Sequence, residues 1–136
     1  MQQNAPAGYQ KTANLVISRY TIQDGLPSRN ATAVIKSRNG FMWIGTENGL
    51  CKFDGYTFKT FTNKKGDSTS ISNNYINAIA EDTKGRIWVG TIDGLNVFDP
   101  NAEKFIRFYH KDANPASVSN DKICSLLADS YGRVWI

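Results

Sequence analysis

The chain has 136 residues, enough for one domain of ordinary size. A hydrophobic content of 40% and an aromatic content of 12% are typical of a packed globular protein and exclude a disordered chain. The net charge is +4, but the basic residues are scattered and Lys64-Lys65 is the only adjacent basic pair. A nucleic-acid site needs a basic stripe, so no nucleic-acid partner is expected.

The chain begins with a polar, unpatterned stretch, and residues 1–14 are expected to be disordered. Residues 15–20 then form a short apolar run, which predicts an outer strand separate from the strands that follow. A first unit of four strands follows within residues 29–62, and a second within residues 74–109. A third unit starts at residues 121–136 and contains only its first two strands.

The units are related by repetition. Trp43 and Trp88 are about 45 residues apart, and Trp135 follows in the same context. The turns Asn48-Gly49 and Asp93-Gly94 are expected to be type I′ hairpins, because both central residues of that turn need a positive φ. A period of this length with four strands per unit is that of a β-propeller blade.

The sequence therefore predicts an all-β chain of four-stranded antiparallel propeller blades. It contains about two full blades, a half blade and one unattached outer strand, so the propeller is incomplete. The positions that recur in the repeat are expected to be structural, with tryptophans packed between blades and glycines at turns or close approaches: Trp43, Trp88, Trp135, Gly45, Gly90, Gly49 and Gly94.

Two cysteines, Cys51 and Cys124, lie at different positions of the repeat and have no metal-ligand spacing. They are expected to be small hydrophobic residues in strands, and neither a metal nor a cofactor is expected. No apolar run approaches the roughly 18 residues of a membrane span. Any attachment to a membrane would therefore come from a downstream part of a longer protein.

The phrase from Ile79 to Leu95, with Gly85-Arg86-Ile87-Trp88-Val89-Gly90-Thr91 at its centre, resembles the two-component-regulator propeller repeat. The phrase from Phe41 to Leu50 resembles it as well. The linking phrases at residues 70–74 and 117–121 are similar to the blade-to-blade loops of hybrid sensor kinases of gut Bacteroides. The resemblance extends over roughly residues 15–136.

This resemblance implies the periplasmic sensor of a hybrid two-component histidine kinase. Such sensors detect polysaccharide-derived oligosaccharides and control the genes for their use, through an inner-membrane helix and a cytoplasmic phosphorelay. The chain would hold the beginning of the first propeller, and it contains no kinase motif. His110 follows an outer strand rather than lying on a dimerisation helix, so it is not interpreted as a phosphoacceptor.

An oligosaccharide site is expected on the propeller face shared by the turns between the second and third strands and the loops between blades. Amides, carboxylates and aromatic rings there are suitable partners for sugar hydroxyls. Each could equally be a turn residue that satisfies backbone groups. The candidates are Arg29, Asn30, Glu47, Asn48, Asn73, Asn74, Tyr75, Asp93, Asn120 and Asp121.

Two other functions stay open. A non-catalytic propeller can act as a scaffold that binds another protein. A propeller enzyme of the streptogramin-lyase type has a similar repeat, but this chain has one histidine and no catalytic motif, so it is not expected to be an enzyme. The downstream sequence would separate these alternatives.

The unpaired blade edges predict self-association. An exposed strand edge is a template for pairing with another chain. The strand at residues 15–20 of one copy is expected to add to the unfinished blade at residues 123–136 of another.

Overall fold

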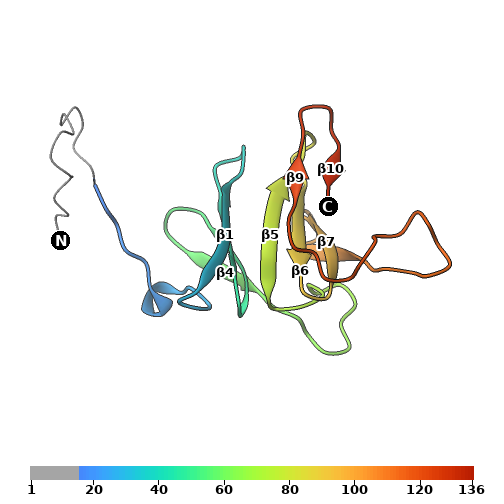
Figure 1. Ribbon diagram of the computed structural model, residues 1–136. Helices are drawn as coiled ribbons and strands as arrows, with labels where there is room; N and C mark the ends of the chain where they lie inside the picture. Colours follow the sequence, from blue (N-terminus) through green and yellow to red (C-terminus); the bar gives the residue numbers. More distant parts are fainter. Residues whose placement is uncertain (1–15) are drawn as a thin grey trace, which may run out of the picture.

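The computed structural model describes residues 16–136 and consists of three antiparallel sheets that lie side by side (Figure 1). The first strands of the three sheets, β1, β5 and β9, are neighbours along one side, which is the arrangement of successive propeller blades. The described part of the chain contains one short helical turn, η1 (Ile22–Asp24). The all-β propeller fold predicted from the sequence is therefore confirmed.

Blade 1 has the strand order β1-β2-β3-β4 and blade 2 the order β5-β6-β7-β8, so each is a simple meander. The half-blade contains β9 and β10. Blade 1 is built from β1 (Ala31–Lys36), β2 (Met42–Thr46), β3 (Gly49–Phe53) and β4 (Phe58–Phe61). Blade 2 is built from β5 (Ile76–Glu81), β6 (Ile87–Thr91), β7 (Gly94–Asp99) and β8 (Lys104–Phe108), and the half-blade from β9 (Leu127–Ala128) and β10 (Val134–Trp135).

Two predicted strands differ from the structure. Residues 16–20 form no strand and pair with no strand of the described chain, although Tyr20 packs its ring against Phe53 and Phe58 of blade 1. The prediction for residues 1–14 lies outside the described residues. The inner strand expected at residues 123–128 is reduced to Leu127–Ala128. In the register of β9 with β10, residues 123–125 would pair with positions beyond Ile136.

The two hairpin turns were predicted one residue too late and with the wrong type. Thr46 pairs with Gly49 and Thr91 with Gly94, so the loops are Glu47-Asn48 and Ile92-Asp93. The φ angle is positive only at the glycines, 136° at Gly49 and 115° at Gly94. A type I′ turn needs two residues with positive φ inside the loop, so these loops are not type I′ turns. They resemble instead the hairpins in which a turn is followed by one glycine with positive φ.

In each blade, a threonine side chain stabilises this turn through two hydrogen bonds to its backbone. The Thr46 hydroxyl accepts a hydrogen bond from the Asn48 backbone N–H (3.1 Å) and donates one to the Gly49 carbonyl (2.9 Å). The Thr91 hydroxyl makes the same pair of bonds with Asp93 and Gly94, both at 3.0 Å. Both threonines are fully buried. The recurrent Gly-Thr-x-x-Gly phrase is therefore the side-chain cap of a hairpin.

The core lies between blades 1 and 2. Trp43 is 2% exposed and stands edge-on to Phe98 of blade 2, with 4.9 Å between ring centroids. Phe61 of blade 1 contacts Phe98 (5.1 Å) and Phe105 (5.6 Å) from the same side. Aromatic residues dominate such interfaces because each buries a large apolar area. Trp43 thus lies at the blade-to-blade contact, whereas Trp88 is half-buried and Trp135 is exposed.

Glycines in the second strands let the next blade approach. A Cβ on Gly45 would lie 2.6 Å from Cγ2 of Ile76, and one on Gly90 would lie 2.5 Å from Cγ2 of Ile123. Beside these contacts, the Thr32 hydroxyl donates to the Ile76 carbonyl (2.6 Å). The same position of blade 2 is Asn77, whose amide donates to the Ile123 carbonyl (2.9 Å). Successive blades are therefore joined by the same contact twice.

Candidate functional site

We call one end of the blades the loop face. It consists of the turns Glu47-Asn48 and Ile92-Asp93, the first inter-blade loop (residues 62–75) and the second inter-blade loop (residues 109–122). Backbone bonds hold these parts together: Ile92 N–H donates to the Tyr75 carbonyl (3.3 Å) and Gly94 N–H to the Asp121 carbonyl (2.6 Å). The opposite end carries the turns between first and second strands.

The first inter-blade loop is fixed by buried polar contacts. Arg107 of β8 donates to the carbonyls of Asp67 and Ser70, both at 2.7 Å. Asn96 of β7 is fully buried, and its carbonyl oxygen accepts from the Ser72 backbone N–H at 2.9 Å while its amide donates to the Ser72 hydroxyl at the same distance. The Asn63 amide donates to the Ile71 carbonyl at 2.8 Å. Buried polar groups with partners give a loop of defined shape.

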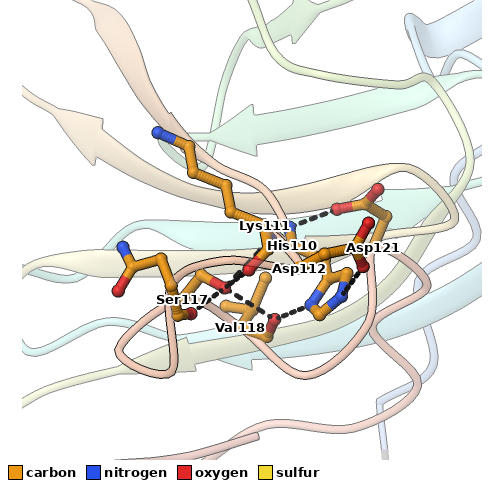
Figure 2. A network of polar contacts seen from close by, with 7 residues as sticks. His110, Lys111, Asp112, Ser117, Val118 and Asp121 are labelled. Carbon is orange, nitrogen blue, oxygen red and sulfur yellow. Dashed lines mark hydrogen bonds and ion pairs between the residues drawn. The ribbon is translucent and has the colours of Figure 1, made fainter.

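The second inter-blade loop has the same framework with different side chains (Figure 2). His110 takes the place of Asn63: its Nδ1 donates to the Val118 carbonyl (2.7 Å), and its backbone N–H donates to the Asp121 carboxylate (2.6 Å). The other ring nitrogen, Nε2, is 3.0 Å from the Asp112 carboxylate. The Val118 carbonyl and then the Asp112 carboxylate raise the pKa of His110, because both favour the charged imidazolium. His110 therefore closes a loop.

The structure brings the predicted candidates to the loop face but divides them into two groups. Four of them use a side-chain oxygen to accept a backbone N–H of their own loop: Asn73 from Tyr75, Asn74 from Asn63, Asn120 from Lys122 and Asp121 from His110. These oxygens stabilise turns, the alternative that the sequence left open.

In the described part of the chain, the side chains of the other six candidates bond to no backbone group. The Asn30 amide donates to the Glu47 carboxylate at 3.0 Å, which joins the start of β1 to the β2–β3 turn. Within residues 16–136, the side chains of Asn48, Tyr75 and Asp93 make no hydrogen bond, and all three are exposed. Arg29 is exposed at the start of blade 1. These side chains can bind a ligand without breaking a loop.

One groove on the loop face contains a predicted candidate. It has a volume of about 430 Å³ and lies between the first inter-blade loop and blade 2. Asp93, Tyr109, Lys64 and Lys65 line it together with Asn63, Gly66, Asp67, Ser68, Ser72 and Arg107. An aromatic ring beside charges of both signs can contact the apolar face and the hydroxyls of a sugar.

Sequence reasoning missed most of this groove. The Tyr109 ring lies against Gly94, where an added Cβ would be 2.8 Å from Cε1. The adjacent pair Lys64-Lys65 was interpreted only as part of a solvated surface with scattered basic residues. Both segments recur in the repeat as the end of an outer strand and the start of a loop, which is the signal that would have placed them on this face.

The opposite end holds a charged cluster that is structural. Asp82 is 1% exposed, and its carboxylate accepts from Arg86 Nε (2.6 Å) and Trp88 Nε1 (2.9 Å). Burial raises the pKa of Asp82, but these hydrogen bonds and those from backbone N–H groups outweigh it and bring the pKa to about 2. Asp129 binds Arg133 and Trp135 in the same way in the half-blade.

Neither cysteine forms a disulfide: Cys51 is buried, which raises the pKa of its thiol, and Cys124 is exposed. In residues 16–136, no group of three or more His, Cys, Asp or Glu side chains is placed to hold a metal ion. No helix in that same range is long and apolar enough to cross a membrane.

Comparison with known proteins agrees with this architecture. The family model described as two component regulator propeller matches residues 25–48 and 70–93, which are the first halves of blades 1 and 2 with the segments before them. Residues 25–48 and 70–93 are therefore similar to two-component regulator propeller repeats. Each match ends at a β2–β3 or β6–β7 turn, so the matched segments include both partners of the Gly45–Ile76 contact, and Gly90 of the Gly90–Ile123 contact.

Two relatives are similar to this propeller-repeat chain. "Histidine kinase P4" of Formosa agariphila is 42% identical over 62 residues, which cover 46% of this chain and 4% of the relative. A solved structure, described as the extracellular domain of the hybrid two component system BT3049 of B. thetaiotaomicron, matches with a TM-score of 0.78 at 27% identity. That match covers 87% of this chain and 17% of the solved chain, so this chain spans a small part of each relative.

Proposed function

We propose that the chain is part of the periplasmic sensor propeller of a hybrid two-component histidine kinase, and that this sensor detects oligosaccharides released from polysaccharides. One observation carries the proposal: 87% of the chain superposes, with a TM-score of 0.78, on the extracellular domain of a hybrid two component system. In this proposal the membrane helix and the kinase belong to the longer protein. The blades themselves perform no catalysis.

The loop-face groove supports the choice of ligand. The Tyr109 ring provides an apolar wall, and Lys64, Lys65 and Asp93 provide one cationic and one anionic side. Sugar rings have an apolar face and a rim of hydroxyls, and such a mixed lining can bind both. The loops that line the groove are held by buried polar contacts, so little ordering is needed on binding.

The test is calorimetric titration of the intact periplasmic region against a panel of plant, algal and host oligosaccharides. Binding of one glycan class, weakened at least tenfold by Tyr109→Ala and by Asp93→Ala, supports the proposal. Tyr56→Ala is the matched control, because Tyr56 is an aromatic residue that is 93% exposed and lies outside the groove. Binding to a protein or peptide and to no glycan would favour the scaffold alternative.

A further inference from the structure

The turn between the first and second strands is held by a carboxylate in blade 2 and in the half-blade. Asp82 accepts hydrogen bonds from the backbone N–H groups two and four positions later, from an arginine side chain and from the indole of Trp88. Asp129 accepts the same set, the indole being that of Trp135. The turn therefore forms a cradle of N–H donors around one carboxylate.

Blade 1 has the donors of this cradle without the carboxylate. Ser37 stands at the acceptor position, and its hydroxyl donates within the turn, where the Asn39 side-chain oxygen is 2.5 Å away and the Phe41 carbonyl 2.9 Å. The corresponding donors are the backbone N–H groups of Asn39 and Phe41 and the indole N–H of Trp43. None of them has an acceptor within residues 16–136. An unpaired buried N–H is costly, so an acceptor is expected here.

The Trp43 indole is oriented as its counterpart is in blade 2. Trp43 stacks on Phe61 with 6.1 Å between ring centroids and 22° between ring planes, and Trp88 stacks on Phe108 at 6.2 Å and 23°. Both phenylalanines pair with the leucine of the Gly-Leu phrase in the third strand. The Trp43 N–H therefore points to the position that corresponds to the Asp82 carboxylate.

A cation lies beside the cradle in both blades. In blade 2 the guanidinium carbon of Arg86 is 5.3 Å from the centroid of the Trp88 ring. In blade 1 Phe41 replaces this arginine, and the Lys52 ammonium lies 3.9 Å from the Phe41 ring centroid and 5.8 Å from that of Trp43. The positive charge is thus retained although it comes from a different strand.

This set of groups favours an anion over a water molecule. Three N–H donors need an acceptor, whereas a water molecule also has two protons to donate. Hydrogen bonds to an anion are also the stronger ones. Glu81 of blade 2 accepts the Arg38 backbone N–H at 2.9 Å, but its charge is opposed by the Arg38 guanidinium at 3.7 Å.

We propose that the first turn of blade 1 binds a small monoanion, for which a carboxylate is the best match, on the N–H groups of Asn39, Phe41 and Trp43. The Trp43 indole nitrogen has no exposed surface, so the anion is as small as formate or chloride. It enters when the exposed Asn39 side chain and the flexible Lys52 side chain move. Because Trp43 packs between blades 1 and 2, the bound anion joins this turn to the inter-blade contact.

The test follows the assigned indole N–H resonances of the three tryptophans in an isotope-labelled full chain by nuclear magnetic resonance. Sodium formate and sodium chloride are titrated separately, and sodium sulfate at equal ionic strength controls for salt. The Trp43 resonance should shift saturably with formate or with chloride and not with sulfate. Those of Trp88 and Trp135 should stay, because their N–H groups already bind carboxylates of the chain.

Ser37→Asp supplies the carboxylate from within the chain. It should shift the Trp43 resonance without added anion and abolish the response to formate and chloride. Tyr56→Asp is the matched control, because it adds a carboxylate at a residue that is 93% exposed and lies outside the cradle, and it should keep the response. Near-ultraviolet circular dichroism checks that both variants are folded.

A Trp43 resonance that responds to neither formate nor chloride would overturn the proposal, even if Ser37→Asp fails to fold. An equal shift at Trp88 would also overturn it, since it would show a general salt effect. So would a response that persists unchanged in folded Ser37→Asp.

Discussion

Blades 1 and 2 have the same strand order and register but differ in how they are held. In blade 2, Asp82 ties the turn between the first two strands to Arg86 and Trp88. In blade 1 the same position is Ser37, and the indole N–H of Trp43 is buried with no partner among the described residues. The Gly45–Ile76 and Gly90–Ile123 contacts are nearly identical. The fold therefore depends on how blades meet, and the turn chemistry is replaceable.

The largest expected effect on stability comes from Trp43, the tryptophan packed between blades 1 and 2. Trp43→Ala should lower the free energy of unfolding by about 3–5 kcal/mol, because it empties a core site between two blades. Trp88→Ala should cost less, since Trp88 is half-buried and stacks on Phe108 of its own blade, with 6.2 Å between ring centroids. Chemical denaturation of both variants measures the difference. Equal losses would mean that the two positions are not distinguished by the blade contact.

A smaller effect is expected at the turn between the first two strands of blade 2, where Asp82 makes contacts that Ser37 does not make in blade 1. Asp82→Ala should cost about 2 kcal/mol, the usual size for hydrogen bonds to a charged group, and Ser37→Ala should cost less. The folded-state pKa of Asp82 is about 2, below its value of 3.8 when unfolded. Its stabilisation is therefore present above pH 4 and is lost as the pH falls toward 2.

Acid unfolding, followed by circular dichroism, compares the parent with Asp82→Asn. The parent should lose stability between pH 4 and 2 more steeply than the variant does. Superimposed acid profiles would contradict a role for the Asp82 carboxylate.

Alanine substitutions at the two glycines compare the contact between blades 1 and 2 with the contact between blade 2 and the half-blade. Gly45→Ala should destabilise by about 1–3 kcal/mol, because the new Cβ would overlap Ile76 in a packed interface. In Gly90→Ala the new Cβ would overlap Ile123, which lies outside any strand, so a smaller loss is expected. Thermal unfolding of the two single variants measures both. A larger loss for Gly90→Ala would show that the half-blade packs as firmly as blade 2.

The smallest effect concerns the two inter-blade loops. Asn63 closes the first loop with an amide, which does not titrate, whereas His110 closes the second with an imidazole whose pKa is raised. The stabilisation by protonated His110 is complete below pH 6.5 and is lost as the pH rises through its raised pKa. Amide hydrogen exchange, corrected for the intrinsic rate, should show residues 110–121 losing protection above neutral pH while residues 63–74 do not change.

His110→Asn makes the second loop resemble the first and should remove this pH dependence. A pH dependence that persists in the variant, or that appears equally in residues 63–74, would show that another group is responsible. Asp112 and Asp121, the two carboxylates near the His110 ring, are unaltered in this variant.

The repeat made the fold predictable. Recurrence of Trp, Gly-Thr and Gly-Leu at matching positions identified the blades and their order. It did not give the turn register, because Asn-Gly and Asp-Gly favour a type I′ turn locally and the buried hydroxyls of Thr46 and Thr91 select a different one. Tertiary contacts overrode the local signal.

The candidate site was predicted only at the level of a face. The sequence placed ten residues on the loop face, but it could not show that Asn74 and Asp121 are used by backbone N–H groups. Nor could it show that Asn96, far away in the sequence, holds Ser72. Side-chain partners across 11 to 24 positions depend on the folded loop, which no local pattern encodes.

Successive units meet through the same glycine–isoleucine contact, Gly45 with Ile76 and Gly90 with Ile123. Nuclear Overhauser effects between the Gly45 Hα protons and the Ile76 γ2 methyl group, and between Gly90 and Ile123, test it directly in solution. The structure predicts both effects, because an added Cβ would lie 2.6 and 2.5 Å from the two methyl carbons. Absence of both, in a chain that is folded by the same spectrum, would contradict the stacking of blades described above.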